Sequence, residues 1–162
     1  MIIAVIGAGQ PSDEVADLAE DVGRELGKRG LTLVCGGLGG VMEAACRGAK
    51  ATGGTTIGVL PGSDPQAANP WVDYPICTGL SHARNVIIVK TGRAAIAVGG
   101  AYGTLSEIGH ALSDGVPVVG LRTWGLTPGD ESPDHSILVA ESAREAVDMA
   151  VQAAEGREGR AS

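Results

Sequence analysis

The hydrophobic positions of the chain alternate between short branched runs and longer segments with helical spacing. The first short run is 2–6, and after it apolar residues recur three and four positions apart, at Val15, Leu18, Ala19, Val22 and Leu26. Acidic side chains begin this second segment and Lys28 and Arg29 end it, which suits a helix dipole, and Gly30 follows. The pattern predicts a strand and then an amphipathic helix.

The same alternation continues along the chain and predicts its fold class. Further strands are expected over 31–35, 55–60, 94–98, 116–121 and 136–139, and further helices over 40–51, 81–91, 104–113 and 141–153. Strands that alternate with helices usually form a parallel sheet covered on both faces. We therefore predict a three-layer α/β, Rossmann-like, doubly wound fold with a mostly parallel sheet.

The segment 81–91 needs a separate argument, because the branched run 86–89 taken alone favours a strand. A parallel strand at 94–98 requires a crossover of about a dozen residues before it. The segment 81–91, with Ser81 as a candidate cap, is the available crossover helix.

The remaining segments are predicted to be loops. The polar, proline-broken segment 61–75 is expected to be a loop beside the carboxyl ends of the strands, and 128–133 a surface loop. Residues 1–155 are predicted to form one domain, and 156–162 a flexible tail.

Charge and residue usage exclude several functions. The net charge is −7 and no segment gathers Lys and Arg into a stripe, which disfavours nucleic-acid binding. The three cysteines form no CxxC pair and are expected to be reduced core thiols. His110 and His135 lack the spacing of metal ligands, so no metal site is predicted. No basic leader and no membrane-length apolar run is found, so we expect a cytoplasmic protein.

Four predicted strands end in small or glycine-rich turns, at 7–12, 35–40, 60–64 and 98–104. The carboxyl ends of parallel strands share one edge of the sheet, where ligands bind in open α/β folds. Glycine lets the backbone approach a phosphate there, although each turn alone is also explained as a tight connection. The candidate ligand-binding residues are Gly7, Gly9, Gly36, Gly37, Gly39, Gly40, Met42, Gly99, Gly100, Gly103 and Thr104.

Two familiar nucleotide motifs do not match these turns. The first turn, GAGQPS, lacks the third glycine of GxGxxG, and Cys35 and Gly36 stand where an acidic residue would hold a ribose. A GxxxxGKT loop is also missing, so NAD, kinase and ATPase chemistry are disfavoured. The four-residue step from Met42 to Cys46 favours helix packing over a cofactor site.

Glu107 and Arg84 are the candidate chemical pair. Glu107 follows Thr104 at the spacing of a capping box, but it also lies beside the glycine turn where a ligand would bind. Arg84 is placed in the first turn of a helix, where a cation is unfavourable unless a ligand or an acid uses it; the alternative is an exposed Arg. Together they suit cleavage at a ribose anomeric carbon, or simple retention of a nucleotide. His82 is interpreted as a polar neighbour of the pair.

The segments CGGLGGVMEAACRGA, HARN and GGAYGTLSE resemble the Lonely Guy and molybdenum cofactor carrier group, Rossmann-like proteins often described as possible lysine decarboxylases. The resemblance covers about residues 2–121. Lonely Guy enzymes are phosphoribohydrolases with the motifs HxRK and PGGxGTxxE. The resemblance implies that Arg84 and Glu107 take the places of the motif Arg and the last motif Glu. It further implies that the phosphate turn comprises Gly99, Gly100, Gly103 and Thr104.

Three departures from these motifs are closer to the carrier branch, whose members bind molybdenum cofactor, a phosphate-bearing pterin. Asn85 stands in place of Lys and Val98 in place of Pro, and Ala101 with Tyr102 makes the turn one residue longer. The leading hypothesis is therefore binding of a nucleotide or pterin phosphate, with nucleoside 5′-monophosphate phosphoribohydrolase activity as the alternative. Related DNA-processing proteins need a basic face that this chain lacks. The resemblance also implies a homodimer or homotetramer.

Overall fold

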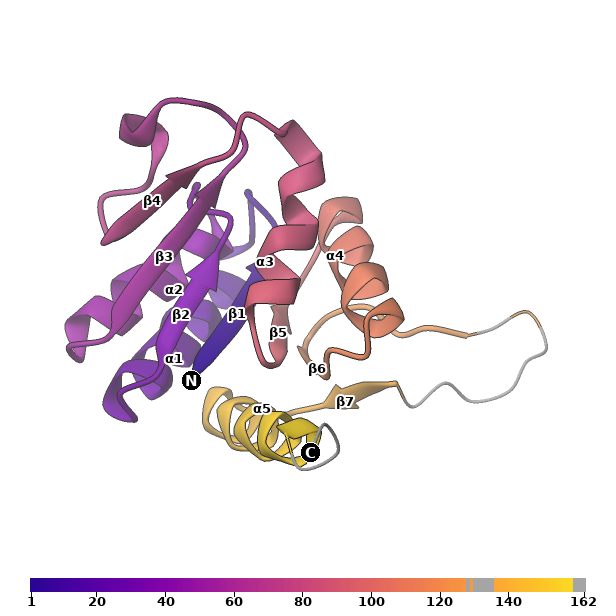
Figure 1. Ribbon diagram of the computed structural model, residues 1–162. Coiled ribbons are helices and arrows are strands. Elements are labelled where there is room, and N and C mark those ends of the chain that lie inside the picture. The colour runs from indigo at the N-terminus through magenta and orange to yellow at the C-terminus, as the bar shows by residue number, and fades with distance from the viewer. Residues whose placement is uncertain (128, 130–135, 159–162) are drawn as a thin grey trace.

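The computed structural model describes residues 1–127, 129 and 136–158. Its centre is a seven-stranded sheet in the order β4-β3-β2-β1-β5-β6-β7, in which every strand pairing is parallel (Figure 1). The strands are β1 Ile2–Gly7, β2 Thr32–Cys35, β3 Thr55–Leu60, β4 Tyr74–Cys77, β5 Ala95–Val98, β6 Val118–Leu121 and β7 Ile137–Val139. The strand order reverses its direction between β1 and β5. A crevice at the carboxyl edge is therefore expected there.

Helices cover both faces of this sheet. They are α1 Asp13–Lys28, α2 Val41–Ala51, α3 Asn85–Thr91, α4 Tyr102–Ser113 and α5 Ala143–Glu158, with short 3-10 helices at Pro65–Ala67 and Ser81–Arg84. One hydrophobic cluster joins α1, α2 and α5 to one face, and a second joins α3 and α4 to the other. The predicted three-layer Rossmann-like fold is confirmed.

Helices α1 and α2 pack with their backbones in contact, which fixes the first two strand-to-helix turns relative to each other. A methyl group added at Gly23 of α1 would lie 1.9 Å from the carbonyl oxygen of Ala45. One added at Gly48 of α2 would lie 1.9 Å from the carbonyl oxygen of Glu20. Both positions need glycine because larger side chains would push the helices apart.

The prediction of a loop over 61–75 is wrong at its end, because strand β4 begins at Tyr74. This strand pairs with β3 from Ile57↔Tyr74 to Leu60↔Cys77, at the edge of the sheet. An edge strand tolerates Pro75, which cannot donate to a ladder. All four residues of β4 are exposed, so Cys77 is a surface thiol and not the core thiol that was expected.

The predicted helix 81–91 and the end of the last helix also differ from the structure. The segment 81–91 starts as a 3-10 helix and becomes α3 only at Asn85, and Ser81 has a positive φ of 51° and does not act as an α-helix cap. Helix α5 continues through Gly156 to Glu158, so a tail beginning at residue 156 is wrong. Residues 159–162, and the predicted loop 128–133 apart from Gly129, lie outside the described residues.

Among the described residues, no helix is both long enough and apolar enough to cross a membrane.

Candidate functional site

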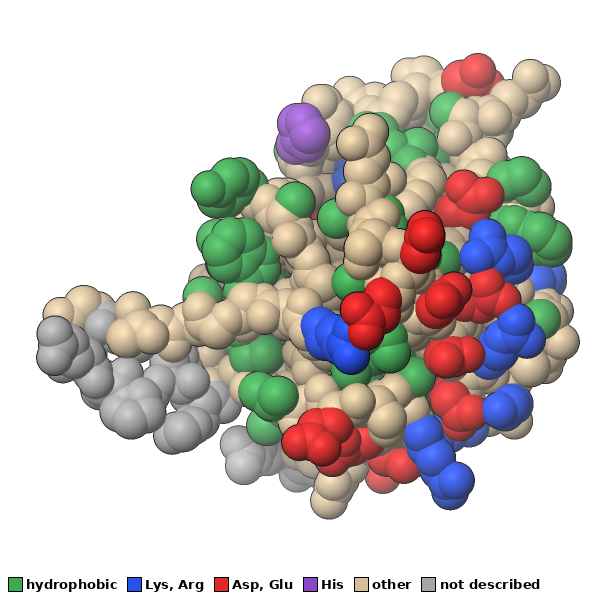
Figure 2. Space-filling view, turned by 180° about the vertical axis from the view of Figure 1, so that it is seen from behind, with side chains coloured by type: hydrophobic (Ala, Val, Ile, Leu, Met, Phe, Trp, Pro, Cys, Tyr) green, Lys and Arg blue, Asp and Glu red, His purple; other side chains and the backbone are tan. Residues whose placement is uncertain are grey.

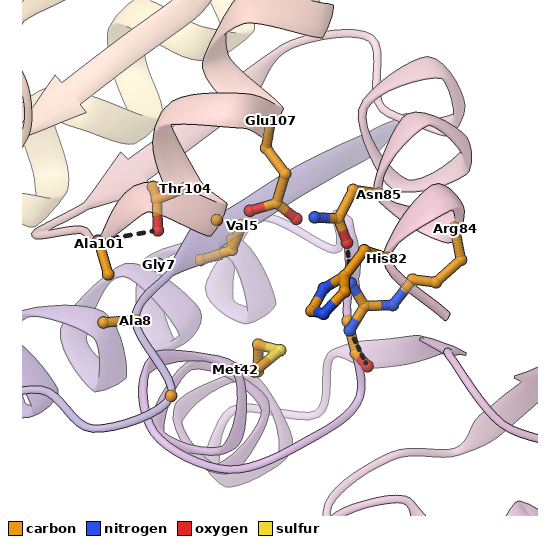
Figure 3. A pocket seen from close by; sticks show the side chains of 13 residues that line it. Val5, Gly7, Ala8, Met42, His82, Arg84, Asn85, Ala101, Thr104 and Glu107 are labelled. Atoms are coloured by element: carbon orange, nitrogen blue, oxygen red, sulfur yellow. Dashed lines mark hydrogen bonds between the residues drawn. The ribbon is translucent and has the colours of Figure 1, made fainter. Parts of the chain in front are cut away.

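A pocket with a volume of about 270 Å³ lies at the carboxyl edge of the sheet, where the strand order reverses (Figure 3). Three of the four predicted turns reach it: the β1–α1 turn through Gly7 and Gly9, the β2–α2 turn through Gly36, and the β5–α4 turn through Gly103. The turn at 60–64 is not part of the lining because β3 lies two strands away from β1.

The structure divides the predicted ligand-binding residues into two groups. The pocket is lined by Gly7, Gly9, Gly36, Met42, Gly103 and Thr104, and also by Arg84 and Glu107. The lining does not include Gly37, Gly39, Gly40, Gly99 and Gly100. Gly40 shows what this second group does: its φ is +70° and a methyl group there would lie 2.4 Å from the carbonyl oxygen of Ala8. It holds the first two turns against each other.

Arg84 reaches the pocket from the last residue of the 3-10 helix Ser81–Arg84, and only 7% of its surface is exposed. Its Nη2 donates to the carbonyl oxygen of Gly36 at 3.4 Å, and its Nη1 donates to Oδ1 of Asn85. A methyl group at Gly36 would lie 2.7 Å from Nη2, so the absence of a side chain there provides the space for the guanidinium. The alternative of an exposed Arg is wrong.

The guanidinium of Arg84 is incompletely paired. Its Nε has no hydrogen-bond partner among the described residues. Burial lowers the pKa of the guanidinium, while the nearby Glu107 carboxyl opposes that effect. A buried cationic donor without a full set of partners is costly, and an anionic ligand would satisfy it.

Glu107 lies on α4 with 7% of its surface exposed, and its carboxyl group points into the pocket (Figure 3). Burial raises its pKa to about 7, and the positive charge of Arg84 only partly opposes this rise. No described residue forms a hydrogen bond to the carboxyl group or places a cationic nitrogen within 4 Å of it. Arg84 and Glu107 therefore share one pocket without forming a direct ion pair.

The predicted capping box of Thr104 and Glu107 is not formed. Helix α4 begins earlier, at Tyr102, with Ala101 as its N-cap residue. The hydroxyl of Thr104 accepts a hydrogen bond from the Ala101 amide at 3.4 Å, so Thr104 takes the position that was expected for Glu107. Glu107 is left one turn inside the helix, with no capping role.

The amino terminus of α4 supplies amide donors at the opposite side of the pocket. The first intrahelical bond joins the Leu105 amide to the Ala101 carbonyl, so the amides of Tyr102, Gly103 and Thr104 precede the intrahelical ladder. Such amides, with the positive end of the helix dipole, form a common binding site for phosphate and carboxylate groups. Gly103 presents no side chain that could block approach to them.

Among the polar residues of the lining, His82 was interpreted only as a neighbour of the pair and Asn85 was noted only as a departure from a motif, so neither was predicted as a ligand-binding residue. The side chain of His82 is exposed and lines the pocket, and buried Asn85 points its amide group toward Glu107 (Figure 3). Both are neighbours of Arg84 in the HARN segment, and this adjacency is the signal that could have identified them. A third missed residue, Asn69, supports the β2–α2 turn by donating from Nδ2 to the Leu38 carbonyl at 3.0 Å.

The pocket contains no evident metal centre. Cys35 and Cys46 are not among the lining residues; their Sγ atoms are 3.5 Å apart, and both are buried free thiols, as predicted. The hydrogen bond between them and burial both raise the pKa of Cys46. Within the described ranges, no cluster of three or more His, Cys, Asp or Glu side chains could hold a metal ion.

Comparisons with known proteins match this fold and the motifs around the pocket. A model of the SLOG cluster4 family matches residues 1–155. The cytokinin riboside 5′-monophosphate phosphoribohydrolase of Mycobacterium tuberculosis is 36% identical over 138 residues, which are 78% of this chain and 73% of that protein. These matches confirm the family resemblance found in the sequence.

Solved structures give the same result. The molybdenum cofactor binding protein of Rippkaea orientalis is 32% identical with a TM-score of 0.84, and the match covers 93% of this chain and 95% of that one. The molybdenum cofactor carrier protein of Chlamydomonas reinhardtii is 36% identical with a TM-score of 0.83, covering 94% and 96%. DNA processing protein A of Helicobacter pylori, at 19% identity and a TM-score of 0.69, covers 94% and 80% and shares the fold alone.

Proposed function

The chain belongs to the SLOG cluster4 family, and on this premise we propose that its pocket binds a small phosphate-bearing nucleotide or pterin, as a molybdenum cofactor carrier does. The observation that carries the proposal is the convergence of Arg84, Glu107 and the amino terminus of α4 on one small pocket. The two molybdenum cofactor proteins with similar structures support it.

The phosphate group is proposed to bind at the amino terminus of α4. The amides of Gly103 and Thr104 would donate to its oxygens, and the charge of Arg84 would attract it across the pocket. Arg84 has an unpartnered Nε in a buried setting, so a bound anion would stabilise a group that the described residues leave incompletely satisfied.

Glu107 favours retention of the ligand over its cleavage. With a pKa of about 7, a large share of this carboxyl group is protonated at neutral pH. A protonated carboxyl donates a hydrogen bond to an oxygen of the ligand and does not repel a phosphate. Cleavage at an anomeric carbon would instead require the negative charge, which stabilises the developing cation.

Phosphoribohydrolase activity is the second candidate, and the placement of Glu107 and Arg84 in one pocket favours it. In this reaction water would add to C1′ of the ribose. The base would leave with the electrons of the N-glycosidic bond and take up a proton. Ionised Glu107 would stabilise the positive charge on the sugar, and Arg84 would hold the phosphate. The similarity to a cytokinin riboside 5′-monophosphate phosphoribohydrolase supports this candidate.

Nucleic acid is not the proposed ligand. Acidic and basic side chains are interspersed on the face shown in Figure 2, and the net charge of the chain is −7. A strand of nucleic acid is normally held by a continuous basic groove with stacking aromatic residues. Single-stranded DNA binding at physiological salt would contradict this part of the proposal.

We also propose that the protein self-associates to form a homodimer or a homotetramer. Light scattering coupled to size exclusion tests this directly: a mass of 16.2 kDa, that of one chain, would refute it.

The test of function incubates the purified protein with a panel of purine and pyrimidine nucleoside monophosphates. Each mixture is analysed by chromatography for free base and ribose 5-phosphate, and the melting temperature is measured in parallel. The binding proposal predicts a rise in melting temperature with the ligand recovered intact. The hydrolase alternative predicts release of base, abolished by Glu107→Gln. If a pterin copurifies with the unmodified protein but not with the Arg84→Ala variant, this would favour the proposal that the protein is a pterin carrier.

The matched control is Asp17→Asn, which neutralises an exposed carboxylate of α1 away from the pocket lining. It is expected to behave as the unmodified protein in both assays. If no phosphate-bearing compound raises the melting temperature and none is consumed, both functional readings are wrong.

A further inference from the structure

Tyr102 is the most exposed large hydrophobic residue of the described chain, with 82% of its surface accessible. It is the first residue of α4, and its two chain neighbours, Ala101 and Gly103, both line the pocket. Tyr102 itself is not among the lining residues, but its position between two of them places its backbone beside the pocket. An exposed tyrosine is not unusual alone, but this one is supported by a second aromatic ring.

Trp124, in the segment after β6, stacks against Tyr102 with ring centroids 5.8 Å apart and an angle of 33° between the rings. Its Nε1 donates a hydrogen bond to the carbonyl oxygen of Ala101 at 3.2 Å. Trp124 is itself partly buried against the hydrophobic cluster beneath α4. This tryptophan thus links the tyrosine, the pocket-lining residue Ala101 and the core, and these contacts restrain the tyrosine ring.

Aromatic residues are scarce in this protein, which gives the pair more significance. The chain has two Trp, two Tyr and no Phe. None of these four lies in the buried hydrophobic core of the described residues, which consists of aliphatic side chains and cysteines. Half of the aromatic residues therefore form one ring pair next to Ala101, which lines the pocket, and the exposed tyrosine of this pair contributes little to core packing.

The size of the pocket requires a site for the rest of the ligand. A volume of about 270 Å³ lies at the low end of ligand pockets, which typically span about 300–1,000 Å³. Its lining combines small and apolar residues with a few polar side chains, among them Arg84, Thr104 and Glu107, and these polar groups suit a phosphate and a sugar or linker. A nucleobase or pterin ring would then extend to the rim, where aromatic side chains stack with such rings.

We infer that Tyr102 is a stacking platform for the planar ring of the ligand, with Trp124 as its positioning residue. The inference rests on the proposed phosphate site and adds a second subsite to it. It predicts that the protein prefers phosphates that carry a heteroaromatic ring over phosphates that carry none. Tyr102 is then a specificity-determining residue and not part of the phosphate cradle.

The experiment compares calorimetric titrations with ribose 5-phosphate, which has no aromatic ring, and with adenosine 5′-monophosphate and neopterin monophosphate, which have one. Tyr102→Ala is expected to weaken binding of the preferred ring-bearing ligand about 5- to 150-fold, the usual contribution of one stacked base. The affinity of the Tyr102→Ala variant for ribose 5-phosphate is expected to equal that of the unmodified protein. Tyr102→Phe keeps the ring and is expected to retain the affinity of the unmodified protein.

Tyr74→Ala is the matched control, because Tyr74 is an exposed tyrosine of β4 that does not line the pocket. It should leave all affinities unchanged. The inference is overturned if Tyr102→Ala weakens all ligands equally or none. It is also overturned, with the phosphate site intact, if the unmodified protein binds ribose 5-phosphate as tightly as the ring-bearing ligands. Failure of every ligand to bind the unmodified protein would refute the proposed function as well.

Discussion

Glu20 on α1 is partly exposed and Glu107 on α4 is buried, and both lie near arginine, but their environments differ. Glu20 accepts a hydrogen bond from Arg47 Nε at 2.8 Å and also pairs with Arg24. The hydrogen bond from Arg47 lowers the pKa of Glu20. Glu107 has no such partner among the described residues, and burial raises its pKa to about 7.

Glu20 shows that a carboxylate of this protein can be paired by arginine side chains at a place that is not part of the ligand pocket. Between α1 and α2 the charged groups neutralise one another, and their role is to hold two helices together. In the pocket, Arg84 and Glu107 face a shared space without pairing directly. Groups left incompletely satisfied in a cavity are the usual sign of a ligand site.

The strongest test of the difference removes one arginine from each region. Arg84→Ala is expected to weaken binding of the phosphate-bearing ligand about 30-fold or more, because it removes a buried cation that faces the anion. Arg47→Ala, which removes an arginine from the helix interface, is expected to leave affinity unchanged. Isothermal titration of both variants measures this. Equal affinities for the two variants would show that the pocket arginine has no special role. Arg84→Lys separates the loss of charge from the loss of the forked geometry.

The second test uses the dependence of stability on pH. An isolated glutamate has a pKa near 4.5, and in the fold Glu107 has a pKa of about 7, so the native state binds more protons between these values. The stability that this group contributes is complete below pH 4.5 and is lost as pH rises through 7, in total about 3 kcal/mol. Urea denaturation at pH 5 and pH 8 measures the change in the free energy of unfolding.

Glu107→Gln is expected to remove most of this pH dependence, because its side chain keeps the shape of the protonated acid and does not titrate. It is therefore expected to be the more stable protein at pH 8. An identical loss of stability in the variant and the unmodified protein between pH 5 and 8 would mean that Glu107 is not the group responsible.

The smallest expected effect is at Glu20, where the sign is opposite. Its pKa is lowered, so its contribution to stability is present above pH 4.5 and is lost as pH falls through the folded-state pKa. Glu20→Gln is expected to destabilise the protein by about 1 kcal/mol at neutral pH, since the pairs lie near the surface. The difference should disappear in strong acid and shrink in high salt, both measurable by urea denaturation. If Glu20→Gln is as stable as the unmodified protein at neutral pH, the proposed contrast between Glu20 and Glu107 is wrong.

The strand and helix periods predicted most of the fold because they record which side of each element faces the core. The alternation from Ile2 to Leu121 was sufficient for the parallel sheet and its two helical layers. It failed at β4, where Tyr74, Pro75 and Ile76 are exposed and their strand conformation depends on pairing with β3. No local pattern contains that information.

The site was predicted as a set of residues but not as an arrangement. Glu107 was selected for its position beside a glycine turn and Arg84 for its unfavourable place in the first turn of a predicted helix, and the structure brings both to one pocket. The spacing of Thr104 and Glu107 suggested a cap, yet a start of α4 at Tyr102 moves Glu107 into the pocket wall. A shift of two residues in a helix start changes which side chains it presents, and sequence patterns do not fix boundaries so finely.

The sequence by itself determined the order of the five helices and of every strand except β4, the glycine turns after the strands and the presence of an Arg and a Glu near them. Only the tertiary structure decided that β1 lies between β2 and β5, which selects three of the four turns for the pocket and leaves 60–64 outside it. The physical reason is that periodicity reports burial of each segment against some partner, whereas strand order depends on pairings between segments far apart in the chain.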